Sequence, residues 1–332
     1  MKKIISALLT FSLLIIACVG LTACGESTDT TKINVGYMSG PTGIGMAQLI
    51  ATNGGVEGND AYSFEKFEDT SAAAAALQTG SLDVACLPTN EVAKLYNTAE
   101  IDIQVLAINC LNALYVVAKS GVEINSFADL EGKTVYTCTN GTPKIILEKL
   151  IAEYGINVTV KTELGEGDSA TVLAKPQDLP AVIAAGKADI VIAPEPIVTN
   201  ALMKNTDYSV KVDLGEAWDS KFETPIAMGC IVARKSFVDE HASLVNKFLS
   251  EYKASIEFMS NSENIETAAT YAVDTTIMGA VPAAKKALTN LGDTIAYVDG
   301  SKMKTFLENS YNAFGLNIIG GKMPDDAFYY VQ

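Results

Sequence analysis

The chain has 332 residues, with 24 basic and 39 acidic side chains and a formal net charge of −15. Such a charge makes nucleic acid a poor partner, because binding to phosphates depends on lysine and arginine. About 300 residues follow a short apolar N-terminal stretch, which is more than one hydrophobic core usually holds, so we expect two lobes or domains.

The N-terminus has the pattern of an export signal. Two lysines precede an apolar stretch at 4–17, which is shorter than the roughly 20 residues that span a bilayer. Leu-Thr-Ala-Cys at 21–24 then resembles the bacterial lipobox, with Cys24 as the lipidated residue, although a secretory signal with a chance cysteine is the alternative. We expect a signal peptide at 1–23, a tether at 24–32 and a lipid anchor on the outer face of a membrane.

In the first part of the chain, apolar runs of strand length alternate with helical stretches. Strands are predicted at 33–38, 61–67 and 83–87, and helices at 43–52, 71–78 and 91–97. The apolar stretch at 101–119 is too long for one strand and predicts two in series, where the chain would cross to a second lobe. This alternation predicts a parallel sheet covered by helices on both faces, whose ligands bind in the loops after strands.

A second α/β unit follows, and then a helical segment. Strands are predicted at 133–137, 157–162, 189–193 and 208–212, and helices at 144–154, 178–185 and 197–204. Residues 226–233 predict the return crossing, and helices follow near 242–260, 263–272, 281–291 and 302–314. The first lobe should therefore comprise 33–112 plus 232–332, and the second lobe 113–231.

Two glycine- and hydroxyl-rich loops precede helices, one in each predicted lobe. Backbone N–H groups and hydroxyls at a helix N-terminus suit a carboxylate, sulfonate, phosphate or neutral polar group. The same residue types are also ordinary turn and capping residues. The candidate ligand-binding residues are Ser39, Gly40, Pro41 and Thr42 in one loop, and Thr139, Asn140, Gly141 and Thr142 in the other.

Four further residues are candidates. Thr89 and Asn90 follow the strand at 83–87, and Asn112 lies on the first crossing. Glu195 stands between two prolines at the end of the strand at 189–193, where a carboxylate can pair with a ligand amine or favour a helix N-terminus.

Neither the cysteines nor the histidine indicates catalysis or a metal. The single histidine, His241, lies in a polar stretch near a helix start, so no Ser/His/Asp triad and no histidine-based metal site is expected, and no cofactor. Beyond the export signal the cysteines are widely spaced and lack C-x-x-C, which favours four buried thiols over two disulfides. They are Cys86, Cys110, Cys138 and Cys230.

Three collinear motifs resemble the nitrate/sulfonate/taurine-type (NitT/TauT) family of solute-binding proteins. FADLEGKTV at 127–135, followed by NGTP at 140–143, is similar to the start of that family's second lobe. AGKAD at 185–189 with PEP at 194–196, and VARKSF at 232–237, are similar to its later signatures. GPTG at 40–43 and the segment 322–330 resemble a firmicute branch of the family.

The resemblance implies a two-lobe, periplasmic-binding-protein-like (type II) α/β fold with two crossover strands and a helical C-terminal segment. It implies an extracytoplasmic, lipid-anchored, monomeric substrate-binding protein, not an enzyme, whose partners are a small-molecule ligand and the permease and ATPase of an ABC importer. A ligand-binding sensor is one alternative. Another is an enzyme like the yeast-type thiamine-pyrimidine synthases, which share this fold and consume their own active-site histidine, but His241 lies outside the predicted cleft.

The resemblance does not carry over the ligand. Anion-binding relatives often place arginine in the cleft, whereas the only arginine here is Arg234, past the second crossing. A sulfonate, a carboxylate or a thiamine-pyrimidine precursor stays open, and a neutral, weakly acidic or aromatic-amine ligand is at least as well supported as a strongly charged anion.

Overall fold

The computed structural model describes residues 29–331 except 100 and 166–169, and the chain from Lys32 onward forms one compact unit. The predicted signal peptide at 1–23 and the lipidation site at Cys24 lie outside the described residues. Among the residues described, no helix is long and apolar enough to cross a membrane.

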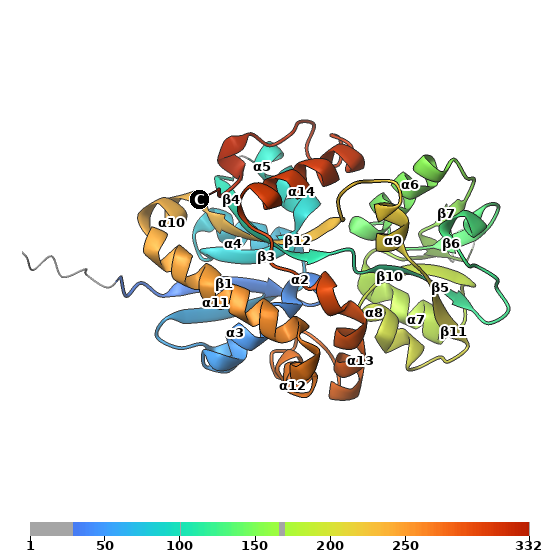
Figure 1. The fold of residues 1–332 in the computed structure, drawn as a ribbon, viewed down its shortest axis with the longest axis horizontal. Helices are drawn as coiled ribbons and strands as arrows, with labels where there is room; N and C mark the ends of the chain where they lie inside the picture. Colours follow the sequence, from blue (N-terminus) through green and yellow to red (C-terminus); the bar gives the residue numbers. More distant parts are fainter. Residues whose placement is uncertain (1–28, 100, 166–169, 332) are drawn as a thin grey trace, which may run out of the picture. The chain divides into compact units, whose positions relative to one another are not determined.

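The first sheet has five strands in the order β2-β1-β3-β12-β4 (Figure 1). β1 pairs in parallel with β2 and β3, whereas β12 runs antiparallel to both of its neighbours, β3 and β4. The strands are β1 (Ile33–Met38), β2 (Tyr62–Phe67), β3 (Val84–Pro88), β4 (Ile103–Leu111) and β12 (Ala227–Arg234).

The second sheet follows the same plan, in the order β11-β5-β10-β6-β7. β10, β6 and β7 are parallel, and β5 runs antiparallel to β10 and β11. In each sheet the antiparallel strand is thus the one through which the chain enters from the other sheet. The strands are β5 (Leu114–Lys119), β6 (Thr134–Tyr136), β7 (Thr159–Lys161), β10 (Ile190–Pro194) and β11 (Tyr208–Asp213), with a separate pair, β8 (Glu163–Leu164) and β9 (Thr171–Val172).

Helices follow the strands of both sheets, as the alternating pattern predicts. In the first lobe these are α2 (Pro41–Ile44), α3 (Ala47–Thr52), α4 (Thr70–Thr79) and α5 (Thr89–Thr98). In the second lobe they are α6 (Thr142–Tyr154), α7 (Leu179–Ala184), α8 (Ile197–Leu202) and α9 (Leu214–Asp219).

The C-terminal part of the chain is helical and returns to the first sheet. The helices are α10 (Lys235–Glu240), α11 (Ala242–Ser260), α12 (Ile265–Asp274), α13 (Val281–Leu291) and α14 (Gly300–Phe314). Between α13 and α14, Val298 exchanges backbone hydrogen bonds with Ile108 of β4, and Tyr330 donates to the carbonyl of Val105. These contacts cover the outer edge of the first sheet.

Both faces of the second sheet are buried. Leu114, Val116 and Ala118 of β5 belong to a core that continues into the first lobe, whereas the alternate residues Tyr115 and Val117 belong to a separate core under α7 and α8. Apolar residues at every position of such a strand follow from burial on both faces.

The chain passes between the sheets twice. β4 ends at Leu111 and β5 begins at Leu114, so the first connection is Asn112–Ala113, and both residues have positive φ, 57° and 35°. The predicted division of the chain into 33–112 plus 232–332 and 113–231 stays a prediction. β12 pairs within the first sheet from Ala227 onward, which sets the second connection before that residue.

Candidate ligand-binding site

The loop after β1 packs closely on two other strands of its sheet. Ser39, Gly40, Pro41 and Thr42 are all partly buried, and Pro41 opens the short helix α2. The carbonyl oxygen of Thr42 accepts a 2.9 Å hydrogen bond from Nδ2 of Asn109 on β4. This packing depends on Gly229 of β12, because a Cβ there would stand 2.6 Å from Cγ2 of Thr42.

Asn109 has an unpartnered acceptor at this point. Its Nδ2 also donates to the hydroxyl of Tyr252 at 3.0 Å, but its Oδ1 is buried with no hydrogen-bond partner. Buried amide oxygens are normally satisfied, so an acceptor without a donor is an uncommon feature. It lies directly beside Thr42, in the first of the two predicted loops.

Thr89 and Asn90 begin helix α5 and are both buried. The hydroxyl of Thr89 donates to the carbonyl of Ala227 at 2.5 Å, so it ties α5 to the start of β12. Oδ1 of Asn90 accepts a long, 3.4 Å hydrogen bond from the hydroxyl of Thr142, the first residue of α6 in the second lobe. The N-terminal ends of one helix from each lobe therefore meet at this pair.

The second predicted loop has an exposed part, Thr139 and Asn140, and a part that contacts the first lobe, Thr142. Thr139 and Asn140 are exposed, and their backbone N–H groups donate to the carbonyls of Leu173 and Ala174 at 2.7 and 3.1 Å. Gly141 is the N-cap of α6 with φ 96°, a conformation that suits glycine. Beyond it the hydroxyl of Thr142 reaches Asn90, as described above.

Glu195 is almost fully buried, with a relative exposure of 1%. Its carboxylate accepts hydrogen bonds from the backbone N–H of Thr199 at 3.0 Å and from the Thr199 hydroxyl at 2.8 Å. A third donor is Nδ2 of Asn290 at 2.9 Å, which comes from α13 of the C-terminal helices. Burial raises the pKa of Glu195 above its usual value, and these three hydrogen bonds oppose the shift.

Asn112 holds the two connecting segments together. Its Oδ1 accepts from the N–H of Ile226 at 2.9 Å, and its own N–H donates to the Ile226 carbonyl at 3.0 Å. Asn112 also lowers the pKa of Asp219, which burial raises. These partners place it at the connection between the lobes.

Carboxylates are numerous on the second lobe beside this connection. Asp213, Glu195 and Glu216 all add, after burial, to the raised pKa of the Tyr115 phenol. Burial also raises the pKa of Asp213 and of Asp219. The predicted site residues include no basic side chain to balance them.

The single arginine of the sequence, Arg234, interacts with residues of the first sheet and not with the candidate ligand residues. Arg234 forms an ion pair with Asp83 and donates to the carbonyl of Leu82 and the hydroxyl of Ser236. It therefore supports the end of β12 in the first sheet, as its place in the sequence indicated.

The four cysteines of the described chain are buried free thiols. Burial raises the pKa of both Cys86 and Cys110 to about 12 and that of Cys138 to about 11. Thiolates are the reactive form of cysteine, so these side chains are chemically inert near neutral pH. Within the described residues, no three histidine, cysteine or acidic side chains gather to hold a metal ion.

Sequence reasoning missed two residues of this region. Asn290 lies in a C-terminal helix that carried no candidate, and Asp219 lies in α9, which was not predicted. Both are polar residues on amphipathic or short helices, and nothing in their local sequence separates them from ordinary surface residues.

Comparisons with known proteins bear on the family and the fold of the chain. The chain matches the model of a family described as NMT1/THI5 like over residues 63–264, which is more than half of its length. No curated protein matches the chain.

Several solved structures share the fold. An ABC transporter protein from Parabacteroides distasonis is 19% identical with a TM-score of 0.74, covering 91% of this chain and 99% of its own. The periplasmic aliphatic sulphonate binding protein SsuA from Escherichia coli is 16% identical with a TM-score of 0.70, covering 90% and 92%. The periplasmic nitrate-binding protein NrtA from Synechocystis PCC 6803 is 12% identical with a TM-score of 0.57, covering 83% and 75%.

These likenesses confirm the predicted two-lobe, periplasmic-binding-protein-like α/β fold. The family match covers the second sheet, both connections between the sheets and all of α11. The chain therefore belongs to the NMT1/THI5-like family.

Proposed function

We propose that the protein is the extracytoplasmic substrate-binding component of an ABC importer and holds a small organic molecule between its two lobes. The fold it shares with sulphonate- and nitrate-binding proteins supports this role. Lipidation at Cys24, a monomeric state, and a permease and an ATPase as partners are parts of the same proposal and rest on the sequence pattern.

One observation carries the proposal. Asn90 and Thr142 join the N-terminal ends of α5 and α6, which belong to different lobes and lie 52 residues apart in sequence. Helix N-termini present backbone N–H groups, and the carboxyl ends of parallel strands are where α/β folds bind ligands. A ligand at this pair would contact both lobes at once, which is what a closing binding protein requires.

The charges around the pair favour a neutral or amine-bearing ligand over a strong anion. The predicted site residues contain one carboxylate, Glu195, and no cation, while Asp213 and Asp219 stand near the connection. An anion would meet repulsion from these carboxylates, whereas the helix N-termini and the charge of Lys286, which acts on Glu195 from α13, would attract it. The unpartnered Oδ1 of Asn109 also suits a ligand that donates a hydrogen bond.

Closure would follow from differential binding. Asn112 and Ile226 join the connecting segments and mark the hinge, and Asn290 to Glu195 is a second hydrogen bond between the lobes. A ligand that binds the closed arrangement more tightly shifts the population toward it without any chemical step.

An enzymatic role finds no support in the position of the histidine. His241 lies between α10 and α11, with its ring 5.0 Å from that of Phe237. Neither helix contributes a candidate ligand residue.

Thermal unfolding of residues 25–332 against a panel of small molecules tests the proposal. The panel contains aromatic amines, pyrimidines, neutral polar molecules, carboxylates, sulfonates and nitrate. A ligand at about a hundred times its Kd adds roughly 2.7 kcal/mol to the unfolding free energy, which raises Tm by a few degrees. Shifts from sulfonates or nitrate alone would contradict the predicted ligand chemistry.

Two variants test the site itself. For the ligand found, Asn90→Ala and Thr142→Val should each weaken binding about five- to tenfold, because each removes a polar group from the junction. Thr305→Val is the matched control, since its exposed hydroxyl bonds only within its own helix. Unchanged affinity in both site variants would place the ligand elsewhere.

A further inference from the structure

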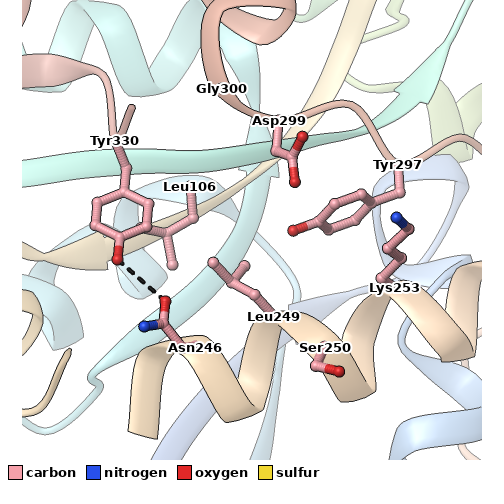
Figure 2. A pocket seen from close by; sticks show the side chains of 9 residues that line it. All are labelled: Leu106, Asn246, Leu249, Ser250, Lys253, Tyr297, Asp299, Gly300 and Tyr330. Carbon is pink, nitrogen blue, oxygen red and sulfur yellow. Dashed lines mark hydrogen bonds between the residues drawn. The ribbon is translucent and has the colours of Figure 1, made fainter. Parts of the chain in front are cut away.

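A pocket lies wholly within the first lobe, on elements that carry none of the predicted ligand residues. It has a volume of about 410 Å³ and is formed by α11, the edge strand β4 and the two C-terminal segments that cover that edge. Its apolar floor consists of Leu106 and Leu249, both buried (Figure 2). This volume falls in the range of small-molecule sites.

Two tyrosines stand on opposite sides of the pocket. Figure 2 shows Tyr330 on one side, where its hydroxyl donates to Oδ1 of Asn246 at 3.2 Å, and Tyr297 on the other. The ring of Tyr297 is fixed by an edge contact with Tyr252, with ring centroids 6.5 Å apart. Aromatic walls above an apolar floor provide a surface for a flat or apolar group.

One charge of each sign borders the same space. Asp299 occupies the N-cap position of α14 but makes no capping hydrogen bond to the backbone, and its carboxylate points into the pocket. After burial, the negative charge of Asp299 is the next cause that raises the pKa of the Tyr297 phenol. Lys253 of α11 lies over the same ring, with Nζ 5.7 Å from the ring centroid.

Asp299 lacks the hydrogen bond to the first turn of the helix that an N-cap aspartate normally makes. An N-cap side chain that bonds the first turn contributes on the order of 1 kcal/mol to a helix. Here the carboxylate is directed toward the pocket beside the Tyr297 phenol, and the ammonium of Lys253 lies beside the same ring. A carboxylate, an ammonium, two aromatic rings and an apolar floor match a molecule that has both charges and an apolar side chain.

We infer that this pocket binds a small zwitterion of amino-acid size, with its ammonium at Asp299, its carboxylate at Lys253 and its side chain between the two tyrosines. The site is distinct from the interlobe one, because all its residues come from the first lobe. It is nevertheless close to that region, since Tyr252 connects Tyr297 to Asn109 and so to Thr42.

Calorimetric titration with L-phenylalanine tests the inference, with phenethylamine and 3-phenylpropionate as probes that each lack one charge. L-Phenylalanine should bind saturably and more tightly than either probe. Asp299→Asn should weaken L-phenylalanine and phenethylamine about fivefold but leave 3-phenylpropionate unchanged, and Lys253→Gln should give the reverse pattern. Asp293→Asn, an exposed acid outside the pocket, is the matched control and should change nothing.

The interlobe variants separate the two sites. Asn90→Ala and Thr142→Val should leave L-phenylalanine binding intact. The inference is overturned if L-phenylalanine shows no saturable binding up to roughly 10 mM. It is equally overturned if the interlobe variants abolish binding while Asp299→Asn and Lys253→Gln retain it. Asp299 is exposed and makes no capping bond, so Asp299→Asn should change Tm little, and a cooperative unfolding transition confirms that the variant is folded.

Discussion

Asn290→Ala should weaken the contact between the lobes without harming either lobe. Nδ2 of Asn290 donates to Glu195 at 2.9 Å and also to the hydroxyl of Thr199 at 3.1 Å. A hydrogen bond to a charged group contributes about 1.5–3 kcal/mol, and we take the lower end because Asn290 is exposed to solvent. A loss of about 1.5 kcal/mol moves the balance between closed and open lobes roughly tenfold toward the open form.

The assay has two readouts. A pair of dyes, one on each lobe, should report a larger open fraction in Asn290→Ala without ligand, and the affinity for the cognate ligand should fall by up to about tenfold. Asn264→Ala is the matched control, since its side chain donates to Phe258 within the same lobe. If Asn290→Ala behaved like this control in both readouts, the hydrogen bond to Glu195 would have no part in closure.

Three further outcomes follow from the same contacts. Because burial raises the pKa of Glu195 above 4.5, its contribution to stability is present below that pH and is lost as pH rises through the raised pKa. Glutamine does not titrate, so the free energy of unfolding of Glu195→Gln, measured in urea, should rise relative to that of the wild type above about pH 4.5. A difference in unfolding free energy that stays constant with pH would refute this. Gly229→Ala forces a Cβ against Asn109 and Thr42 and should lower the unfolding free energy by about 1–3 kcal/mol, whereas an unchanged value would mean that the loop yields freely. Asn112→Ala, at φ 57°, should be less stable than Asn112→Gly in the same denaturation assay, because only glycine adopts that conformation without strain.

Periodicity was sufficient for most of the secondary structure. The pattern at 33–38 predicted β1 to the residue, and the long apolar stretch at 101–119 resolved into β4 and β5 as expected. Burial on both faces makes such strands continuously apolar, so the signal is local and strong.

The elements that were missed are short or depend on their neighbours. α9 has only six residues and includes a glycine, and its start depends on the side chain of Asp213, which accepts from the N–H of Gly215 at 2.7 Å. The pair β8 and β9 has two residues in each strand. Segments of this length carry too few residues to show a period.

Sequence placed the candidate loops after the right strands but could not place their side chains against one another. Asn90 and Thr142 were both predicted, yet their contact depends on how two lobes meet. Glu195 was considered for a ligand amine or a helix N-terminus; its carboxylate bonds Thr199 within α8 and also Asn290 of a distant helix. Such partners come from tertiary packing, which no local pattern encodes.

The position of β12 has a consequence for how the chain acquires its structure during synthesis. β12 lies between β3 and β4, so the first sheet is incomplete until residues 227–234 have been made. All five strands of the second sheet lie within residues 114–213, so that sheet can form first. Non-local pairing slows folding, because the intervening loop must close before the contacts form. The N-terminal half of the first lobe should therefore remain unfolded, and open to chaperones or proteases, while more than a hundred later residues emerge from the ribosome.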